Sequence, residues 1–362
     1  MTRHLLGRRD MMLLGAGLPL LGANVASAQS PTSLTVMIPN IAVNGKLREI
    51  AEAQARVKIV DDPFVSTPDT VSKVLAPGGT SRYDLIMAQS GYSRVPMLGP
   101  KAGAEKAAPL DLSKIPNAAN VADLFKPDIV SRDGVTYGLP YFIGYDSVVY
   151  NADVISDKDP YTQSWGMIFD DKYAGKIAWF DTAVQMLTAA ALYLGKTAPE
   201  TMTPDEVADV GKFLISKKKN VRTIWTTFSQ AASLLSSGEV LCAYGSIPVR
   251  MELQQQGKNF TNAWPKEGVL SFVSDLYIPK DSTHLDAAHA LFNTLIGPPY
   301  VDQLATVSGY LPANKLAGAG LSEEQKLRAG FGIYTGQTKA TPLKLPTALN
   351  VWIETWSKVK SA

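Results

Sequence analysis

The sequence predicts an α/β protein built from two lobes that extended segments join. Strands and helices alternate in the first part of the chain, and a second alternation follows the long β-rich segment 138–151. The chain has 362 residues, 46% of them hydrophobic, which is enough to bury large cores in about two domains. We therefore expect each lobe to be a mostly parallel sheet flanked by helices, with a ligand cleft at the hinge.

The N-terminus has the pattern of an export signal. Three arginines, among them the pair in "GRRDMMLLG", precede the apolar run 11–21, and "ASA" ends at Ala28 as a small-x-small cleavage site. A membrane anchor is the alternative, but a bilayer span needs roughly 20 apolar residues and this run is shorter. We predict that residues 1–28 are a twin-arginine-like signal peptide, cleaved near Ala28. The pattern leaves open whether export follows the twin-arginine or the general secretory route.

The mature chain is expected to carry no net charge. Of the 35 basic and 33 acidic residues, the leader holds three and one, so 32 of each remain after cleavage. This balance gives no support to nucleic acid or an anionic membrane surface as a partner. The single cysteine, Cys242, stands in the apolar stretch "EVLCAY", so we expect a buried strand residue rather than a nucleophile.

The first lobe is predicted from short apolar runs that flank a helical stretch. The expected elements are the strand "SLTVMIP", the helix 46–57, and the strands "VKIVDD" and "YDLIMAQ". The segment "GLPYFIGYDSVVYN" (138–151) is long enough to run from one lobe into the other.

A strand, a turn and a helix follow one another in "YAGKIAWFDTAVQ" (173–185). The strand ends at Asp181 and Thr182, where a helix begins. The free backbone N–H groups of such a helix start can bind a ligand, and a side chain can equally cap them. The sequence at this turn is compatible with either role, a ligand site or an ordinary helix cap.

The rest of the second region also alternates between helix and strand. Thr203 and Glu206 predict a capping box at the start of one helix, and Ser322 and Gln325 predict another. The further expected elements are helices at 228–238, 284–297, 299–309 and 349–362 and strands at 240–246 and 267–280.

The sequence lacks the common catalytic and metal-binding motifs. It has no G-x-S-x-G elbow, no H-E-x-x-H pair, no Walker loop and no G-x-G-x-x-G turn. His284 and His289 stand five apart on a predicted helix and so point in different directions. Asp170 and Asp171 are adjacent and indicate a polar turn. We expect a protein that is not an enzyme and has no metal or cofactor; an enzyme exported in folded form is the alternative from another class.

Several separate blocks resemble one protein family. "YDLIMAQS", "GLPYFIGYDSVVYN", "SWGMIFDDKYAGKIAWFDT", "WPKEGVLSFVSDLYIPKDSTHLDAAHALFNTLIGP" and "SGYLPANK" resemble motifs of the spermidine/putrescine-type periplasmic solute-binding proteins of ABC importers. The resemblance covers nearly the whole mature chain, in the right order. It implies the type 2 periplasmic-binding-protein fold, whose two lobes close over a small ligand by a hinge motion.

The resemblance also implies a division of the chain and a role. Residues 29–140 with about 275–318 are expected to form lobe 1, and residues 141–274 with about 319–362 to form lobe 2. The protein is expected in the periplasm as a monomer that captures a small polar organic solute. Its expected partners are that solute and an ABC permease in the inner membrane, with no nucleic acid.

The acids that polyamine receptors use are mostly missing at the matching positions. Thr182, Gln185 and Ser274 stand where the family has acids, and Phe272 stands where it has Trp. The resemblance implies that Thr182 and Gln185 face the ligand. It also implies that Asp181, whose neighbour is the matching contact, caps the helix. The turn at Asn40 has no acid either. A buried ammonium group without a compensating charge costs several kcal/mol. We therefore expect a monoamine or zwitterion as the ligand, with a true polyamine receptor of rearranged contacts as the alternative.

One acid remains as a partner for one ammonium group. Asp146 can hold the charge and Tyr145 can offer a ring face, although Asp146 could also be a structural hydrogen-bond acceptor. Arg250 and Lys344 are candidate partners for an anion. The alternative for Arg250 is a charge on a helix surface, and the alternative for Lys344 is a solvated side chain. The sequence does not decide whether either faces the cleft. The predicted ligand-binding residues are Asn40, Gln89, Ser90, Tyr145, Asp146, Thr182, Gln185, Trp225, Tyr244, Ser246, Arg250, Phe272, Ser274 and Tyr310.

Overall fold

The computed structural model describes residues 30–362, so the predicted signal peptide 1–28 lies outside the described residues. The strands are β1 (Thr32–Met37), β2 (Val57–Asp61), β3 (Leu85–Gln89), β4 (Val130–Arg132), β5 (Val135–Asn151), β6 (Ile177–Phe180), β7 (Val221–Trp225), β8 (Cys242–Ser246), β9 (Phe260–Asn262), β10 (Val269–Tyr277), β11 (Leu311–Pro312) and β12 (Ala340–Pro342). The α-helices are α1 (Asn40–Val43), α2 (Gly45–Ala55), α3 (Thr67–Leu75), α4 (Gly79–Arg82), α5 (Ser90–Leu98), α6 (Ala183–Tyr193), α7 (Pro204–Lys217), α8 (Phe228–Ser236), α9 (Ile247–Gln255), α10 (Leu285–Leu295), α11 (Tyr300–Ser308), α12 (Glu323–Arg328) and α13 (Leu349–Ser361). Short 3-10 helices are η1 (Leu112–Lys114), η2 (Pro116–Asn120), η3 (Asp123–Asp128), η4 (Pro160–Gln163), η5 (Trp165–Ile168), η6 (Asp171–Tyr173), η7 (Pro199–Thr201), η8 (Lys218–Asn220) and η9 (Phe331–Ile333).

Local capping explains where two of these helices begin. At α7 the Thr203 hydroxyl accepts a hydrogen bond from the Glu206 backbone N–H, and the Glu206 carboxylate accepts one from the Thr203 N–H. At α12, Ser322 and Gln325 make the same reciprocal pair. Both predicted capping boxes are therefore confirmed.

The expectation that Asp181 caps a helix is wrong. The cap of α6 is Thr182, whose hydroxyl accepts a hydrogen bond from the backbone N–H of Gln185. The Asp181 carboxylate accepts hydrogen bonds from the indole of Trp356 at 2.8 Å and from Lys360 at 3.1 Å. Both donors lie on α13, so Asp181 ties the end of β6 to the C-terminal helix.

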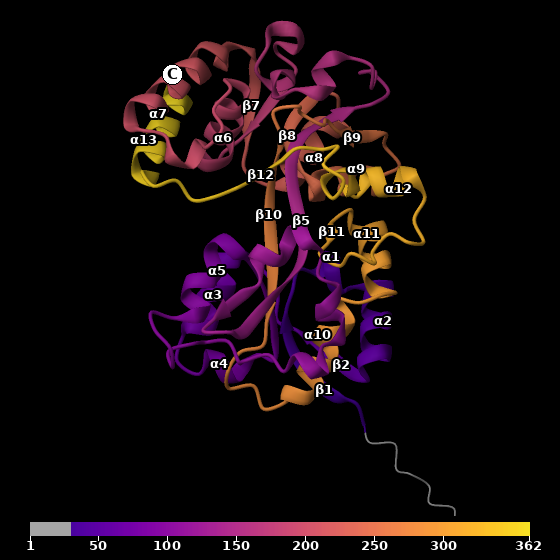
Figure 1. Cartoon of the computed structure of the whole chain (residues 1–362). Coiled ribbons are helices and arrows are strands. Elements are labelled where there is room, and N and C mark those ends of the chain that lie inside the picture. Colours follow the sequence, from indigo (N-terminus) through magenta and orange to yellow (C-terminus); the bar gives the residue numbers. More distant parts are fainter. Residues whose placement is uncertain (1–29) are drawn as a thin grey trace, which may run out of the picture. The chain divides into compact units, whose positions relative to one another are not determined.

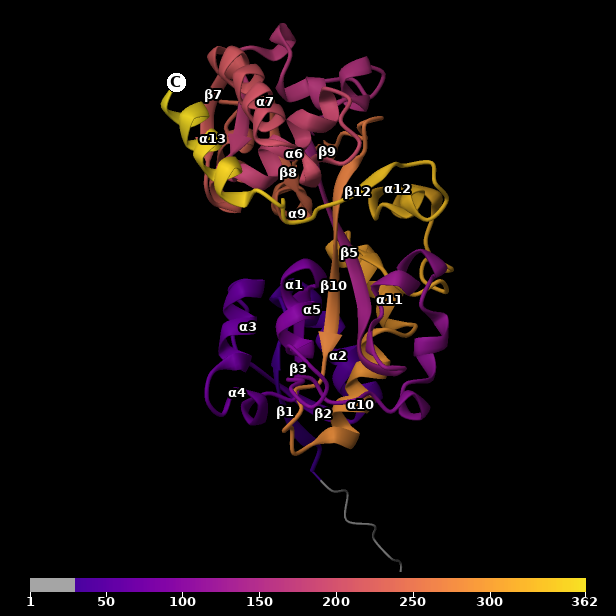
Figure 2. The same ribbon diagram turned by 60° about the vertical axis from the view of Figure 1, so that its left-hand side comes forward.

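All twelve strands of the described residues belong to one sheet, with the main order β2-β1-β3-β10-β5-β8-β6-β7. The outer pairs are parallel at both ends of this order, whereas β5 and β10 run antiparallel to each other in the middle. These two strands pass together from one group of helices to the other, as Figure 1 and the turned view of Figure 2 show. The predicted two-lobe α/β class is confirmed, with β5 as the long crossing strand.

Two large hydrophobic cores lie one on each side of this crossing, and a smaller third cluster draws on residues 37–130 and Tyr277. One draws on residues 34–145 and 269–333 together with Ile247. The other draws on residues 148–270 and 352–359 and is rich in buried tryptophan. Each lobe thus buries its own apolar side chains, while the finer lobe boundaries stay predictions.

The C-terminal segment makes a third connection between the lobes. β12 pairs in parallel with β10, from Val269 to Ser271. The backbone N–H of Leu343 then donates to the carbonyl of Ser271 at 2.7 Å, and Lys344 forms an ion pair with Glu200 at 2.8 Å. α13 follows and packs on α6 and α7, so three segments cross at the waist between the lobes.

Cys242, His284 and His289 make contacts within the fold. Cys242 is buried in β8, as predicted, and burial raises the pKa of its thiol. The His284 ring lies 3.1 Å from the carboxylate of Asp84, and the His289 ring accepts a hydrogen bond from the Asp111 backbone N–H. Within residues 30–362, no three His, Cys, Asp or Glu side chains group to hold a metal ion. No helix of that range is long and apolar enough to cross a bilayer.

Candidate functional site

A cavity of about 380 Å³ lies where both lobes meet the crossing strands. The first lobe contributes the turn after β1 and the end of β3, and the second lobe contributes the ends of β6, β7 and β8. The crossing strands β5 and β10 form the wall between them. Strand ends and helix starts from both lobes therefore converge at the hinge, where the sequence predicts a ligand cleft.

Asp146 is the one charged side chain among the described residues that line this cavity. It stands on β5 and is paired with Leu270 of β10 and Ser246 of β8. It is 6% exposed, and the Tyr244 hydroxyl donates a hydrogen bond to its carboxylate at 2.8 Å. Burial raises the pKa of Asp146 to about 7, and the Tyr244 hydrogen bond opposes that rise. A cation in the cavity would stabilise the ionised carboxylate.

Aromatic rings form much of the remaining wall. Phe180 stacks on Trp225 with the ring centres 4.0 Å apart, and Tyr310 stacks on Phe142 at 4.3 Å. The negative charge of Asp146 adds to the burial that raises the pKa of Tyr310, which places this phenol near the carboxylate. A cation held by Asp146 would therefore also meet ring faces.

Uncharged polar side chains complete the lining. Gln89 lies at the end of β3, Gln185 in the first turn of α6, and Ser246 and Ser274 on β8 and β10. The Ser246 hydroxyl is buried and has no hydrogen-bond partner among the described residues, so a ligand could satisfy it. The side-chain oxygen of Gln185 accepts a hydrogen bond from Thr182, which fixes its position.

The structure brings together nine of the fourteen predicted residues: Gln89, Asp146, Gln185, Trp225, Tyr244, Ser246, Phe272, Ser274 and Tyr310. Ser90 lines a neighbouring cavity of about 320 Å³, and Tyr145 and Arg250 line a third of about 1070 Å³. Asn40 begins α1 and Thr182 caps α6, and neither lines any of these three cavities. Ligand binding by each residue stays a prediction.

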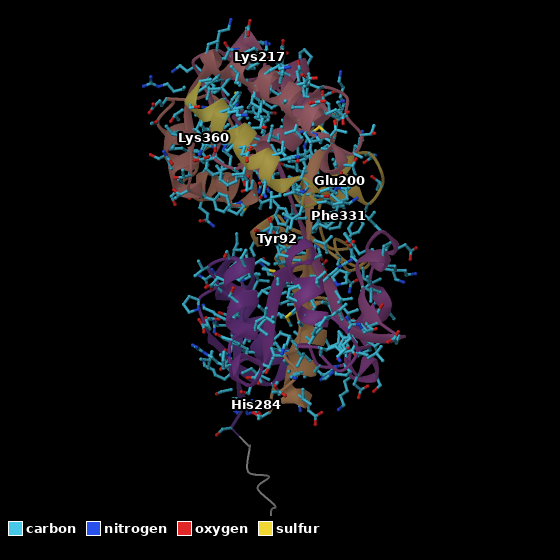
Figure 3. The ribbon with its side chains drawn as sticks, turned by 90° about the vertical axis from the view of Figure 1, so that its left-hand side faces the viewer. Tyr92, Glu200, Lys217, His284, Phe331 and Lys360 are labelled. Atoms are coloured by element: carbon cyan, nitrogen blue, oxygen red, sulfur yellow. The ribbon has the colours of Figure 1, made fainter. Side chains whose placement is uncertain are left out.

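The neighbouring cavity shares Gln89, Tyr92, Phe272 and Leu343 with the first one. Phe272 projects from β10 over Gly144 of β5, where a Cβ atom would come within 2.1 Å of the ring. Glycine at this position therefore makes room for the ring between the two cavities. Figure 3 shows Tyr92 on the first lobe at the level where the lobes face each other.

The two candidate anion partners have different surroundings. Lys344 lines the neighbouring cavity, yet its ammonium group is held by Glu200. Arg250 is only 2% exposed, so the alternative that it is a helix surface charge is wrong. It lines the third cavity and not the one that contains Asp146.

Much of the apolar lining is missing from the predicted set. Phe64, Phe142, Phe180 and Phe228 all reach the cavity. Phe64, Phe142 and Phe228 carry no signal that separates them from core residues. Phe180 does carry such a signal in the sequence, because it ends a strand directly before the helix start at Asp181 and Thr182.

Fold and cavity together define a class of protein. Two lobes joined by three segments enclose a small cavity. Its described lining consists of aromatic rings, hydroxyls, carboxamides and one carboxylate, groups that suit the binding of a small molecule. These are the features of a solute-binding protein.

The chain belongs to the bacterial extracellular solute-binding protein family, whose model matches residues 46–326. It is therefore a binding protein and not an enzyme. It is 26% identical over 331 residues to the putrescine-binding periplasmic protein PotF of Escherichia coli (strain K12), covering 86% of both chains. It is 28% identical over 328 residues to the putrescine-binding periplasmic protein SpuD of Pseudomonas aeruginosa (strain UCBPP-PA14), covering 84% of this chain and 85% of SpuD. The resemblance to the spermidine/putrescine-type proteins is confirmed.

Solved structures share the fold. The spermidine/putrescine ABC transporter substrate-binding protein PotD from Streptococcus pneumoniae matches with a TM-score of 0.75 at 20% identity, covering 91% of this chain and 98% of that one. The binding protein AgtB from A. tumefaciens R10, solved with agropinic acid, matches with a TM-score of 0.60 at 17% identity, covering 91% and 96%. At these identities the likeness shows the fold alone.

Proposed function

We propose that this chain is the periplasmic binding component of an ABC importer, and that it captures a small organic solute with one ammonium group, a monoamine or a zwitterion. The names of the relatives and of the structural neighbours support the transport role. In that role the protein acts as a monomer and passes its solute to a permease in the inner membrane. The predicted signal peptide fits the same compartment.

The proposed ligand class rests on the position of Asp146. It is the one charged side chain that the described residues place in the lining of the 380 Å³ cavity, so it can neutralise one ammonium group. A second ammonium group in the same space would be buried without a carboxylate, at a cost of several kcal/mol. Cation–π contacts contribute only about 0.5–2 kcal/mol, so the rings do not replace a missing acid.

A polyamine receptor with rearranged contacts is the second candidate, because the relatives are named for putrescine and spermidine. A diamine that reached from Asp146 into the neighbouring cavity would need a second acid there. Asp128 lines that cavity, but its carboxylate already pairs with Arg94 at 2.9 Å. The diamine would have to compete with this ion pair.

Four probes with the same four-carbon chain separate these candidates by isothermal titration calorimetry of the purified protein. Butylamine carries one ammonium group, 4-aminobutyrate adds a carboxylate, putrescine adds a second ammonium group, and butyrate carries only the carboxylate. We expect butylamine or 4-aminobutyrate to bind at least about tenfold more tightly than putrescine, since about 1.4 kcal/mol corresponds to tenfold. Butyrate is expected to give no measurable binding.

Putrescine binding as tight as that of either other amine would overturn the proposed ligand class and leave the receptor role in place. If none of the three amines bound, the ammonium partner assigned to Asp146 would be wrong.

A further inference from the structure

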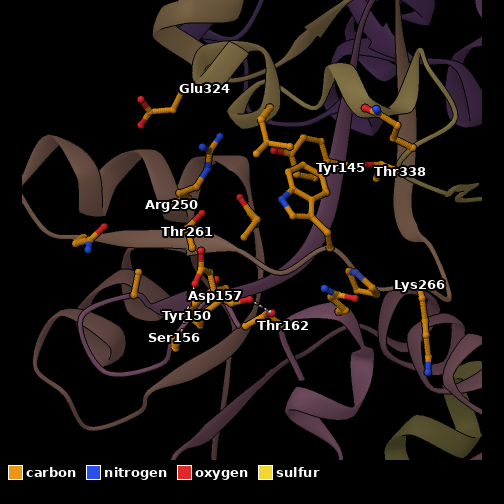
Figure 4. A pocket seen from close by; sticks show the side chains of 18 of the residues that line it. Tyr145, Tyr150, Ser156, Asp157, Thr162, Arg250, Thr261, Lys266, Glu324 and Thr338 are labelled. Carbon is orange, nitrogen blue, oxygen red and sulfur yellow. Dashed lines mark hydrogen bonds between the residues drawn. The ribbon is translucent and has the colours of Figure 1, made fainter. Parts of the chain in front are cut away.

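The third cavity lies on the other face of β5 from Asp146. Successive residues of a strand point to opposite faces, and Tyr145 lines this cavity while Asp146 lines the first one. We call it the rear cavity. The segment after β5, helix α9, strand β9 and the stretch from α12 to β12 form its walls, and Figure 4 shows it from close by.

Arg250 extends from α9 into the lining of the rear cavity (Figure 4). It is 2% exposed, and its Nε and Nη2 atoms have no hydrogen-bond partner among the described residues. A guanidinium group carries a positive charge and only donor atoms. The chain therefore buries a positive charge with unused donors, which is strongly unfavourable unless a negative group meets it.

The surrounding backbone holds this guanidinium group in place. Gly309 follows α11 with φ +66°, and a Cβ atom there would come within 2.4 Å of Nη2 of Arg250. The positive charge of Arg250 also opposes the rise that burial causes in the pKa of Tyr145, so this phenol lies nearby. Arg250 is thus enclosed by the end of α11 on one side and by the crossing strand on another.

Asn262 supplies a second buried polar group to the same cavity. It is 4% exposed, and neither its amide nitrogen nor its amide oxygen has a hydrogen-bond partner among the described residues. Thr261, which precedes it on β9, and Thr338 also line the cavity. Amide N–H, hydroxyl and guanidinium groups are all donors that suit an oxyanion.

The other charged side chains that the described residues place in this lining are exposed: Asp153, Asp157, Lys266, Glu324 and Lys339. Solvent screens exposed charges, whereas a buried charge keeps its field. In Figure 4, Lys266 lies well apart from Arg250 and Thr261. Among the described residues of this lining, Arg250 is therefore the one buried charge.

We propose that the rear cavity is a binding site for a small oxyanion, a carboxylate or a phosphate group, held by Arg250 with Asn262 as a second donor. This site is separate from the cavity of Asp146 and does not depend on which solute that cavity takes.

Titration of the purified protein with inorganic phosphate, at an ionic strength held constant with sodium chloride, tests the site. We expect saturable binding of one phosphate, weakened at least about tenfold by Arg250→Met. The matched control, Lys266→Met, removes an exposed positive charge from the same lining and should change the affinity less than about threefold. Asp146→Asn should also leave phosphate binding unchanged. Sulfate and acetate in parallel titrations distinguish a phosphate-like group from a carboxylate.

If Arg250→Met does not fold, Asn262→Ala takes its place, with an expected loss of about threefold or more. Absence of binding by phosphate, sulfate and acetate alike would overturn the proposal. So would phosphate binding that survives the Arg250 or Asn262 substitution unchanged, because the anion would then bind elsewhere.

Discussion

Two buried carboxylates, Asp146 on β5 and Asp275 on β10, stand on neighbouring crossing strands and have very different surroundings. Burial raises the pKa of each to about 7. Asp146 lines the cavity at the hinge and accepts a hydrogen bond from Tyr244. Asp275 is fully buried, lines none of the described cavities, and accepts hydrogen bonds from Ser90 at 2.6 Å and Tyr277 at 3.1 Å.

A raised pKa therefore marks burial and does not by itself mark a ligand site. Both protein donors of Asp275 reach its Oδ2 atom, and Arg94 lies 3.8 Å from that atom, while Oδ1 has no hydrogen-bond partner among the described residues. Its role is to join β10 to the start of α5 through Ser90. Asp146 differs because it borders open space, where a ligand could reach it. Access to a cavity, more than the pKa shift, separates a binding carboxylate from a structural one.

The largest expected effect is on Asp146 itself. Asp146→Asn keeps the shape of the side chain but removes its charge, so it should weaken the tightest-binding four-carbon amine by about 100-fold. That loss corresponds to about 2.7 kcal/mol, within the range for removing one partner of a buried charge pair. Isothermal titration calorimetry measures it directly.

Asp275→Asn is the matched control, because it changes an equally buried carboxylate with a similar pKa. It should alter amine affinity less than about threefold, because Asp275 lines none of the described cavities. Equal losses of affinity in the two variants would show that both carboxylates act through the hinge and not through contact with the ligand.

The pH dependence of amine binding should come from Asp146 alone. A carboxyl group with a pKa of about 7 is mostly protonated at pH 6 and mostly ionised at pH 8, while the amine stays charged at both. Because the ammonium group needs the ionised form, affinity should rise about tenfold from pH 6 to pH 8. The rise should disappear in Asp146→Asn and persist in Asp275→Asn; persistence in both would assign it to another group.

A smaller effect is expected from the tyrosine that supports each carboxylate. Tyr244→Phe removes the hydroxyl that donates to Asp146 at 2.8 Å, and should weaken amine binding about fivefold at pH 7. Tyr277→Phe removes the corresponding donor to Asp275 and should leave amine affinity within about twofold. Calorimetry of the two variants side by side tests whether the hydrogen bond acts on the ligand partner alone.

The smallest effect is expected at Lys344. Its ammonium group pairs with Glu200 and its side chain is 61% exposed, so the pair contributes little stability. Lys344→Ala should change the affinity for 4-aminobutyrate less than about twofold. A larger loss with 4-aminobutyrate, but not with butylamine, would show that Lys344 leaves Glu200 to meet the ligand carboxylate.

The sequence by itself determined the features that depend on neighbouring residues. The capping box of Thr203 and Glu206 and the long crossing strand at 138–151 follow from local spacing and from a continuous apolar run. The same run holds Tyr145 and Asp146, so the acid that lines the cavity was predictable as a candidate. The two-lobe class followed from the order of these elements.

Only the tertiary structure decided which face of β5 borders the hinge cavity. A strand exposes alternate residues to opposite sides, so strand geometry separates Tyr145 from Asp146, but only packing decides which of the two meets the hinge cavity. Likewise, Arg250 lies against Gly309 of a distant segment, and Asp181 meets Trp356 of the last helix. These contacts join segments that are far apart along the chain, and no local sequence pattern predicts which distant surfaces will meet.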